Sequence, residues 1–179
     1  TSLNVQLSTE RLMRLAGEPD VSLDLHDRWL RGQNLIAKFD KESWQRAVAI
    51  FRDSIRENPA FSPFYSSLVQ MNNIEHLVHP GVLRNLDKAK ATLELAKIAV
   101  ELDPVDSRAH LCCGWSYTFA LREAEAAPHM DLACELNDND PWTLLSSAHY
   151  CAFCGSIEQA QLRASQSLAL SLAPSRLEW

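Results

Sequence analysis

Apolar residues recur every three or four positions over most of the chain, which is the period of an amphipathic helix. Before Pro59, for example, Trp44, Val48 and Phe51 lie on one face of a helix. The alternation that is typical of strands occurs only at residues 3–7. The pattern therefore predicts an all-α protein in which helix exceeds about 60% of residues, against roughly a third in an average globular protein.

A repeat of 34 residues organises the second half of the sequence. Residues 107–117 align with residues 141–151, and small residues fall on small residues throughout this alignment. Pro104 and Asp138, which close two similar Glu-Leu-Asx segments, are also 34 residues apart. A fixed period that divides into two helical halves is typical of a helix-turn-helix solenoid. We therefore expect a right-handed α-α superhelix of about four helix pairs.

Helix start and stop signals divide the chain into units. Ser62-Pro63 opens the second pair with a cap followed by proline at the first helical position, and Asp140-Pro141 opens the fourth pair in the same way. The second pair is interrupted near Pro80 and resumes near Asn85. Pro128 falls within the second helix of the third pair, so we expect that helix to start late or to kink.

These signals also give the domain limits. The repeat domain is expected to cover residues 23–174, with its first helix pair beginning near Leu23. Residues 1–22 are interpreted as a linker or as the tail of a preceding domain. Residues 175–179 are interpreted as the start of a further, truncated helix, so we expect the sequence to be a piece of a longer protein.

Composition narrows the function classes without identifying one. Of the 179 residues, 46% are apolar and 22% are charged, which is enough to bury a substantial core. The net charge of −6 is spread over helices of mixed sign, without the basic stripe that contact with a DNA backbone requires. No apolar run approaches the roughly 18 residues of a membrane span. The odd number of five cysteines favours reduced thiols. We therefore expect a cytoplasmic chain that binds neither nucleic acid nor membrane directly.

Catalytic motifs are absent from the sequence. It contains no glycine-rich phosphate loop, no His-Glu-x-x-His and no nucleophile elbow, and its five glycines are too few to build a nucleotide cradle. We therefore expect a non-enzymatic chain that has no catalytic residues and needs no cofactor.

Cys151-x-x-Cys154, beside His149, has the spacing of half a zinc site. In the repeat register, however, Cys151 takes the place of Tyr117 and Cys154 takes that of Ala120, and both positions are expected on inner helix faces. A buried free cysteine behaves as a small hydrophobic residue. Core packing is therefore the preferred interpretation and no metal is expected, while a zinc site and a redox role are the alternatives.

The first helices of such an array line its concave side, where positions 2, 5, 9, 12 and 13 of each unit form a groove. We expect Trp115 and Trp142 to lie there within reach of one another, with Arg108 beside them. Exposed apolar surface usually marks an interaction site, so the groove is expected to bind a protein or peptide partner. The alternative is that residues 1–22 or a neighbouring domain cover it. The candidate binding residues are Gln70, Asn73, Arg108, Trp115, Phe119, Trp142, His149 and Phe153.

The units resemble tetratricopeptide repeats (TPRs). That pattern has an aromatic residue at position 4, small residues at positions 7, 8, 20 and 27, a larger apolar residue at position 24 and proline at position 32. The third unit departs from it at His110 and Asp138, which replace the aromatic residue and the proline. The matching residues are Trp29, Ala47, Phe51, Ser54 and Pro59 in the first unit, and Cys113, Gly114, Tyr117, Ala126, Met130 and Ala133 in the third.

A narrower resemblance extends over four short segments. They resemble bacterial regulators in which a TPR array follows an N-terminal winged-helix domain, and a similar array follows the catalytic domain of some bacterial class III adenylate cyclases. The resemblance implies a protein-interaction and regulatory module of a transcriptional regulator. The regulatory region of a cyclase is the alternative, and a scaffold for self-association is the second alternative. The segments are Val5-Gln-Leu7, Asp27-Arg-Trp-Leu-Arg-Gly-Gln33, Ala47-Val-Ala-Ile-Phe51 and Glu57-Asn-Pro59.

Overall fold

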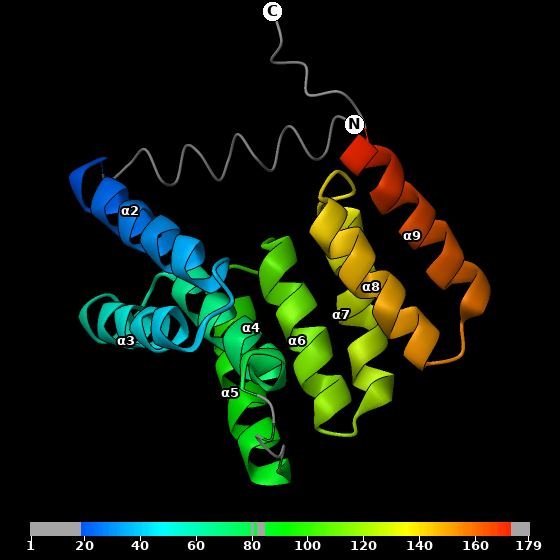
Figure 1. Cartoon of the computed structure of the whole chain (residues 1–179), viewed down its shortest axis with the longest axis horizontal. Coiled ribbons are helices and arrows are strands. Elements are labelled where there is room, and N and C mark those ends of the chain that lie inside the picture. Colours follow the sequence, from blue (N-terminus) through cyan, green and yellow to red (C-terminus); the bar gives the residue numbers. More distant parts are fainter. Residues whose placement is uncertain (1–18, 80, 82–84, 173–179) are drawn as a thin grey trace, which may run out of the picture.

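The computed structural model describes residues 19–79, 81 and 85–172, and these form eight α-helices arranged as four consecutive pairs (Figure 1). Helix makes up 83% of the described residues, which contain no strand. The expected all-α superhelix of four helix pairs is therefore confirmed. The helices are α2 (Pro19–Ile36), α3 (Lys41–Glu57), α4 (Ser62–Val78), α5 (Leu86–Leu102), α6 (Ser107–Phe119), α7 (Glu123–Leu136), α8 (Pro141–Phe153) and α9 (Ile157–Leu172).

The 34-residue period is present in the coordinates as well as in the sequence. The first residues of α6 and α8 are 34 apart, and so are those of α7 and α9. Asp106 is the N-cap of α6, and Asp140 is the equivalent N-cap of α8. The side chain of each accepts hydrogen bonding from backbone N–H at the start of its helix. The Asp140-Pro141 start signal is thus confirmed.

Two expected helix boundaries differ from the structure. Helix α2 begins at Pro19, four residues before the expected Leu23. Ser62 is the first residue of α4 and not its N-cap, which is Phe61, and the Ser62 hydroxyl donates to the Ala99 carbonyl of α5 at 2.9 Å. The expected linker at residues 1–22 lies mostly, and the expected helix start at residues 175–179 wholly, outside the described residues.

Of the two outcomes expected at Pro128, a late start of α7 or a kink, the late start is wrong. Helix α7 begins at Glu123 and continues through Pro128 to Leu136. The proline removes one backbone hydrogen bond of the helix. The apolar face formed by the buried Ala126, Met130 and Ala133 holds the helix in place, so tertiary packing outweighs the local cost.

In the first and third helix pairs, one large apolar side chain of the second helix packs on a glycine of the first helix. In the first pair a Cβ atom on Gly32 would lie 2.3 Å from the Phe51 ring, and in the third pair one on Gly114 would lie 3.0 Å from Met130. Gly32 and Gly114 are therefore structurally equivalent. This equivalence places Trp29 at the fifth position of its unit and not at the aromatic fourth position that the sequence comparison assigned to it.

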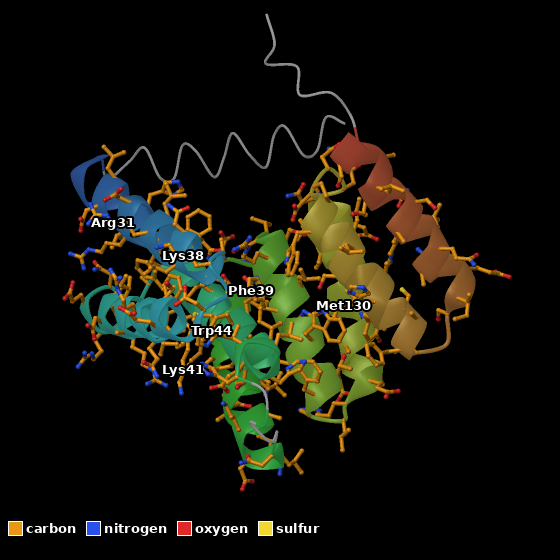
Figure 2. The ribbon with its side chains drawn as sticks, viewed as in Figure 1. Arg31, Lys38, Phe39, Lys41, Trp44 and Met130 are labelled. Carbon is orange, nitrogen blue, oxygen red and sulfur yellow. The ribbon has the colours of Figure 1, made fainter. Side chains whose placement is uncertain are left out.

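Two clusters of buried apolar side chains lie toward the two ends of the array. One surrounds Trp44, Phe51 and Phe64 in α2–α4, and the other surrounds Met130 and Tyr150 in α6–α9. Figure 2 labels Trp44 and Met130, one in each cluster. Among the described helices, none has both the length and the apolar character needed to cross a membrane.

Candidate protein-interaction surface

A polar cluster joins α2, α4 and α6. The Ser67 hydroxyl accepts hydrogen bonds from Trp29 Nε1 at 3.0 Å and from Gln33 Nε2 at 2.7 Å, and it donates to the Pro63 carbonyl at 2.6 Å. Arg108 Nη1 donates to Gln33 Oε1 at 3.0 Å, and its guanidinium lies 5.8 Å from the centre of the Trp29 ring. Arg108 thereby connects α6 to α2, across the intervening unit.

An aromatic cluster joins α6 and α8. The ring of Trp115 stacks on Phe119 with 5.3 Å between centroids, and it meets Tyr150 and Phe153 edge-on at 6.3 and 6.2 Å. Trp115 Nε1 donates to the Ser146 hydroxyl at 2.8 Å, which fixes the orientation of the indole. We call Trp115, Phe119, Tyr150 and Phe153 the aromatic cluster.

Part of this cluster faces solvent. Phe153 is 81% exposed, and Trp142 and Leu145 on the same helix are 43% and 39% exposed. Trp115 and Phe119 are half-buried, and Tyr150 is buried beneath them. The α6–α8 edge therefore presents apolar and aromatic side chains of the kind that anchor protein interfaces.

Two of the three contacts between successive first helices use the same positions of the repeat. Gln33 donates to Ser67, and Trp115 donates to Ser146, so a long side chain of one unit reaches a small hydroxyl residue of the next. Cys112, the equivalent small residue in the middle, donates its thiol hydrogen to the Ser66 carbonyl at 3.3 Å. In the last unit, no described helix follows to make the equivalent contact.

The eight predicted binding residues divide into three groups. Trp115, Phe119 and Phe153 come together in the aromatic cluster. Trp142 and His149 are exposed on α8, although Trp142 is not among the ring partners recorded for Trp115 in the described residues. The expected proximity of the two tryptophans is thus not found as a ring contact.

The other three predicted residues lie toward α2–α4. Arg108 contacts Gln33 and Trp29 of α2 instead of the tryptophans that it was expected to flank. Gln70 is half-buried, and its Oε1 atom is buried without a hydrogen-bond partner in this structure. Asn73 is buried, and its amide donates to the Ser116 hydroxyl at 3.1 Å, so it packs α4 against α6 and is not an exposed groove residue.

Sequence reasoning missed Trp29, Gln33 and Ser67 of the polar cluster and Tyr150 of the aromatic cluster. The sequence contains a signal for Ser67, because a small residue occupies the same position in three successive units. These residues are Ser67, Cys112 and Ser146. The contact between Gln33 and Arg108 had no such signal, since it joins residues 75 apart on helices of non-adjacent units.

The cysteines lie in different surroundings. Cys151 is buried as expected, but Cys154 is exposed at the C-cap of α8, so the prediction that it packs in the core is wrong. Burial raises the pKa of the Cys112 and Cys113 thiols to about 12, which leaves both protonated at neutral pH and poor nucleophiles. No group of three or more His, Cys, Asp or Glu side chains in the described part of the chain has an arrangement that could hold a metal ion.

Comparison with known proteins identifies the fold. No protein-family model and no curated protein sequence matches the chain. Among solved structures, TTC0263, a thermophilic TPR protein of Thermus thermophilus, has a TM-score of 0.68 at 17% identity, over 98% of this chain and 91% of that one. The chain has the TPR fold. MamA from Desulfovibrio magneticus RS-1 is also similar, with a TM-score of 0.54 at 16% identity, over 97% of this chain and 96% of that one. At these identities the TPR likeness concerns architecture alone.

Proposed function

We propose that this TPR array is a non-enzymatic interaction module that binds a segment of a partner protein on the α6–α8 edge. The observation that carries the proposal is the exposure of Phe153, whose ring meets Trp115 edge-on next to the stacked ring of Phe119. Exposed aromatic side chains held in place by neighbours lose little entropy on binding and commonly dominate interface energetics.

The chemistry of the surface favours a partner with two features. The aromatic cluster would accept an apolar anchor, such as one face of an amphipathic helix. Arg108 lies seven residues before Trp115 on α6, which is two helical turns along the same face. Its guanidinium has further N–H donors beyond the one that contacts Gln33, so an acidic group of the partner would complement it.

Binding to a selected peptide tests this function. Peptides would be selected from a displayed random library on the immobilised protein, and their affinities measured by calorimetry. We expect Phe153→Ala and Trp142→Ala each to weaken binding by about tenfold or more, because each removes an exposed anchor. Leu77→Ala, at an exposed apolar residue of α4, is the matched control and is expected to leave affinity unchanged. Equal effects of all three changes, or no selectable peptide, would contradict the proposal.

For the wider context, we propose the regulatory part of a larger bacterial transcriptional regulator that acts in the cytoplasm. The segments around Trp29 and Phe51 support this context through their resemblance to such regulators. The regulatory region of an adenylate cyclase is the alternative. The genomic sequence upstream of the codon for Thr1 separates them, since it would encode a winged-helix domain in one case and a cyclase domain in the other.

Self-association is a second candidate function. It is favoured by the apolar character of the last helix pair, α8–α9.

A further inference from the structure

The last helix pair is depleted of charge and rich in exposed apolar residues. From Pro141 to Leu172 the only Asp, Glu, Lys or Arg residues are Glu158 and Arg163, and Arg163 is buried with its guanidinium on Asp131 of α7 at 2.6 Å. The same pair holds six of the thirteen large apolar residues that are exposed in the described chain, so its surface is the most apolar part of the array. These six are Trp142, Leu145, Phe153, Ile157, Leu162 and Leu168.

The repeat register explains part of this exposure. Leu145 is equivalent to Leu111 of the preceding unit, yet Leu145 is 39% exposed whereas Leu111 is 3% exposed. Leu168 is likewise equivalent to Cys134, which is half-buried. Helix α8 packs on α6 and α7 and covers the internal positions, whereas no described helix follows α9. Leu145, His149 and Leu168 therefore form a face that a further helix would cover in an internal unit, and we call it the trailing face.

The opposite end of the array has a different character. On α2, Arg28 pairs with Asp24 at 3.0 Å and Arg31 pairs with Asp27 at 2.6 Å. Figure 2 labels Arg31 on this helix. Stacking this charged end on the uncharged trailing face would remove the ion pairs from water without new partners, which is unfavourable. The two ends are thus poorly matched for a head-to-tail filament.

We propose that the trailing faces of two copies of this chain pack against each other across a twofold axis. An isologous contact requires a surface that complements itself. The trailing face meets this requirement because it brings no like charges together and contains Leu145 and Leu168, which lack the cover that their counterparts receive from the next unit. The contact continues the stacking of α8 on α6 and α7 in the direction of the array.

Light scattering during size-exclusion chromatography and sedimentation equilibrium on the full 179-residue chain test this proposal. We expect a dimer at about 100 μM that dissociates on dilution. Leu168→Glu would place two like charges in the apolar contact, and we expect it to weaken dimerisation by at least about a hundredfold. Because burial of apolar surface drives the contact, we expect its dissociation constant to change by less than about threefold between about 0.1 M and 1 M salt.

Leu162→Glu is the matched control. Leu162 lies on the same helix and is 52% exposed, close to the 59% of Leu168. Its equivalent in the internal unit, Pro128, is also exposed, so Leu162 faces away from the trailing face and its replacement should leave the dimer intact.

Three outcomes would overturn the proposal. They are a wild-type monomer at about 100 μM, equal dissociation by the two glutamate variants, and a monomer in which α9 is protected from hydrogen exchange by residues 173–179 of its own chain. Peptide binding that is lost in Phe153→Ala while the mass remains dimeric would separate the partner site from this interface.

Discussion

Leu121 and Gly155 are equivalent residues that follow α6 and α8, and both have a positive φ, of 61° and 78°. Each sits in the same C-terminal motif. After α6 the Arg122 N–H donates to the Tyr117 carbonyl at 2.9 Å, and after α8 the Ser156 N–H donates to the Cys151 carbonyl at 2.8 Å. The left-handed conformation costs a leucine about 1 kcal/mol that glycine avoids.

Exchanging the two residue types tests this strain. We expect Leu121→Gly to raise the free energy of unfolding by about 0.5–1 kcal/mol, because Leu121 is exposed and loses little packing. Gly155→Leu should lower it by about 1 kcal/mol through the backbone alone, since a Cβ there would meet no atom within 4 Å. Urea denaturation measures both, and a change of the same sign in the two variants would contradict the explanation.

A chain of hydrogen bonds runs between α6 and α7. His110 Nε2 lies 2.9 Å from the Pro104 carbonyl and must donate to it, so Nδ1 of a neutral His110 accepts from His129 Nδ1, also at 2.9 Å. His129 Nε2 is then free to accept from the Cys113 thiol at 3.7 Å. Burial, and secondarily the neighbouring His110, lowers the pKa of His129.

This shift makes stability depend on pH. Above about pH 6.5 both the folded and the unfolded chain hold His129 neutral. As the pH falls below that value the unfolded chain takes up the proton first, so the free energy of unfolding decreases toward the lowered pKa of the folded state. We expect His129→Phe to be less stable at about pH 7.5 but to lose less stability between about pH 7.5 and 5.5. Urea unfolding at both pH values measures this, and an equal loss of stability in the wild type and the variant would contradict the explanation.

At the scale of the helix pair, Gly32 and Gly114 permit close approach to different partners. The partner of Gly32 is the ring of Phe51, a fully buried side chain within the core of α2–α4. The partner of Gly114 is Met130, an unbranched side chain that adopts other rotamers readily.

We therefore expect unequal costs for the same substitution. Gly32→Ala should lower the free energy of unfolding by about 1–3 kcal/mol, because the Phe51 ring must move within a packed core. Gly114→Ala should stay within about 1 kcal/mol of the wild type, since the shift of Met130 is offset by the better helix propensity of alanine. Chemical denaturation measures both, and a larger loss in Gly114→Ala would contradict this account.

Helices were well predicted from the sequence where local signals and the repeat agree. The start of α8 is marked by the cap Asp140 and by Pro141, and α3 is marked by the helical period of its apolar residues from Trp44 to Phe51. Both signals depend on neighbouring residues alone. Pro128 does not delay the start of α7, because the packing of that helix outweighs the local effect of the proline. Cys154 is exposed and not in the core, because it follows the last residue of α8, where the helix no longer defines an inner face. These errors arise from tertiary context, which a single unit does not contain.

For the surface of the whole molecule, the repeat register places Phe119 and Phe153 at equivalent positions. Both contact Trp115 in the structure. The register did not predict that Arg108 would reach Gln33, because that contact depends on how strongly the array curves over successive units. Whether these residues bind a partner stays a prediction.

Stability should not be uniform along the array. The α8–α9 pair packs on the preceding unit less extensively than the third pair packs on the second, and the buried Arg163, held by Asp131, is a main polar link between α9 and α7. In a solenoid each unit is stabilised by its own contacts and by those with its neighbours. The last pair is therefore expected to open locally before α4–α6.

Hydrogen exchange on the full chain tests this gradient together with the proposed dimer. In Leu168→Glu, which should be monomeric, we expect the amides of α9 to exchange faster than those of α5 at every protein concentration. In the wild type, dimerisation covers the trailing face, so exchange in α9 should slow as the concentration rises while exchange in α5 stays constant. Local opening that exposes α9 must first separate the two copies, which makes its rate follow the monomer population. Slow exchange in α9 of the monomeric variant would show that the last pair needs no cover, and the argument for an interface at this end would fail with it.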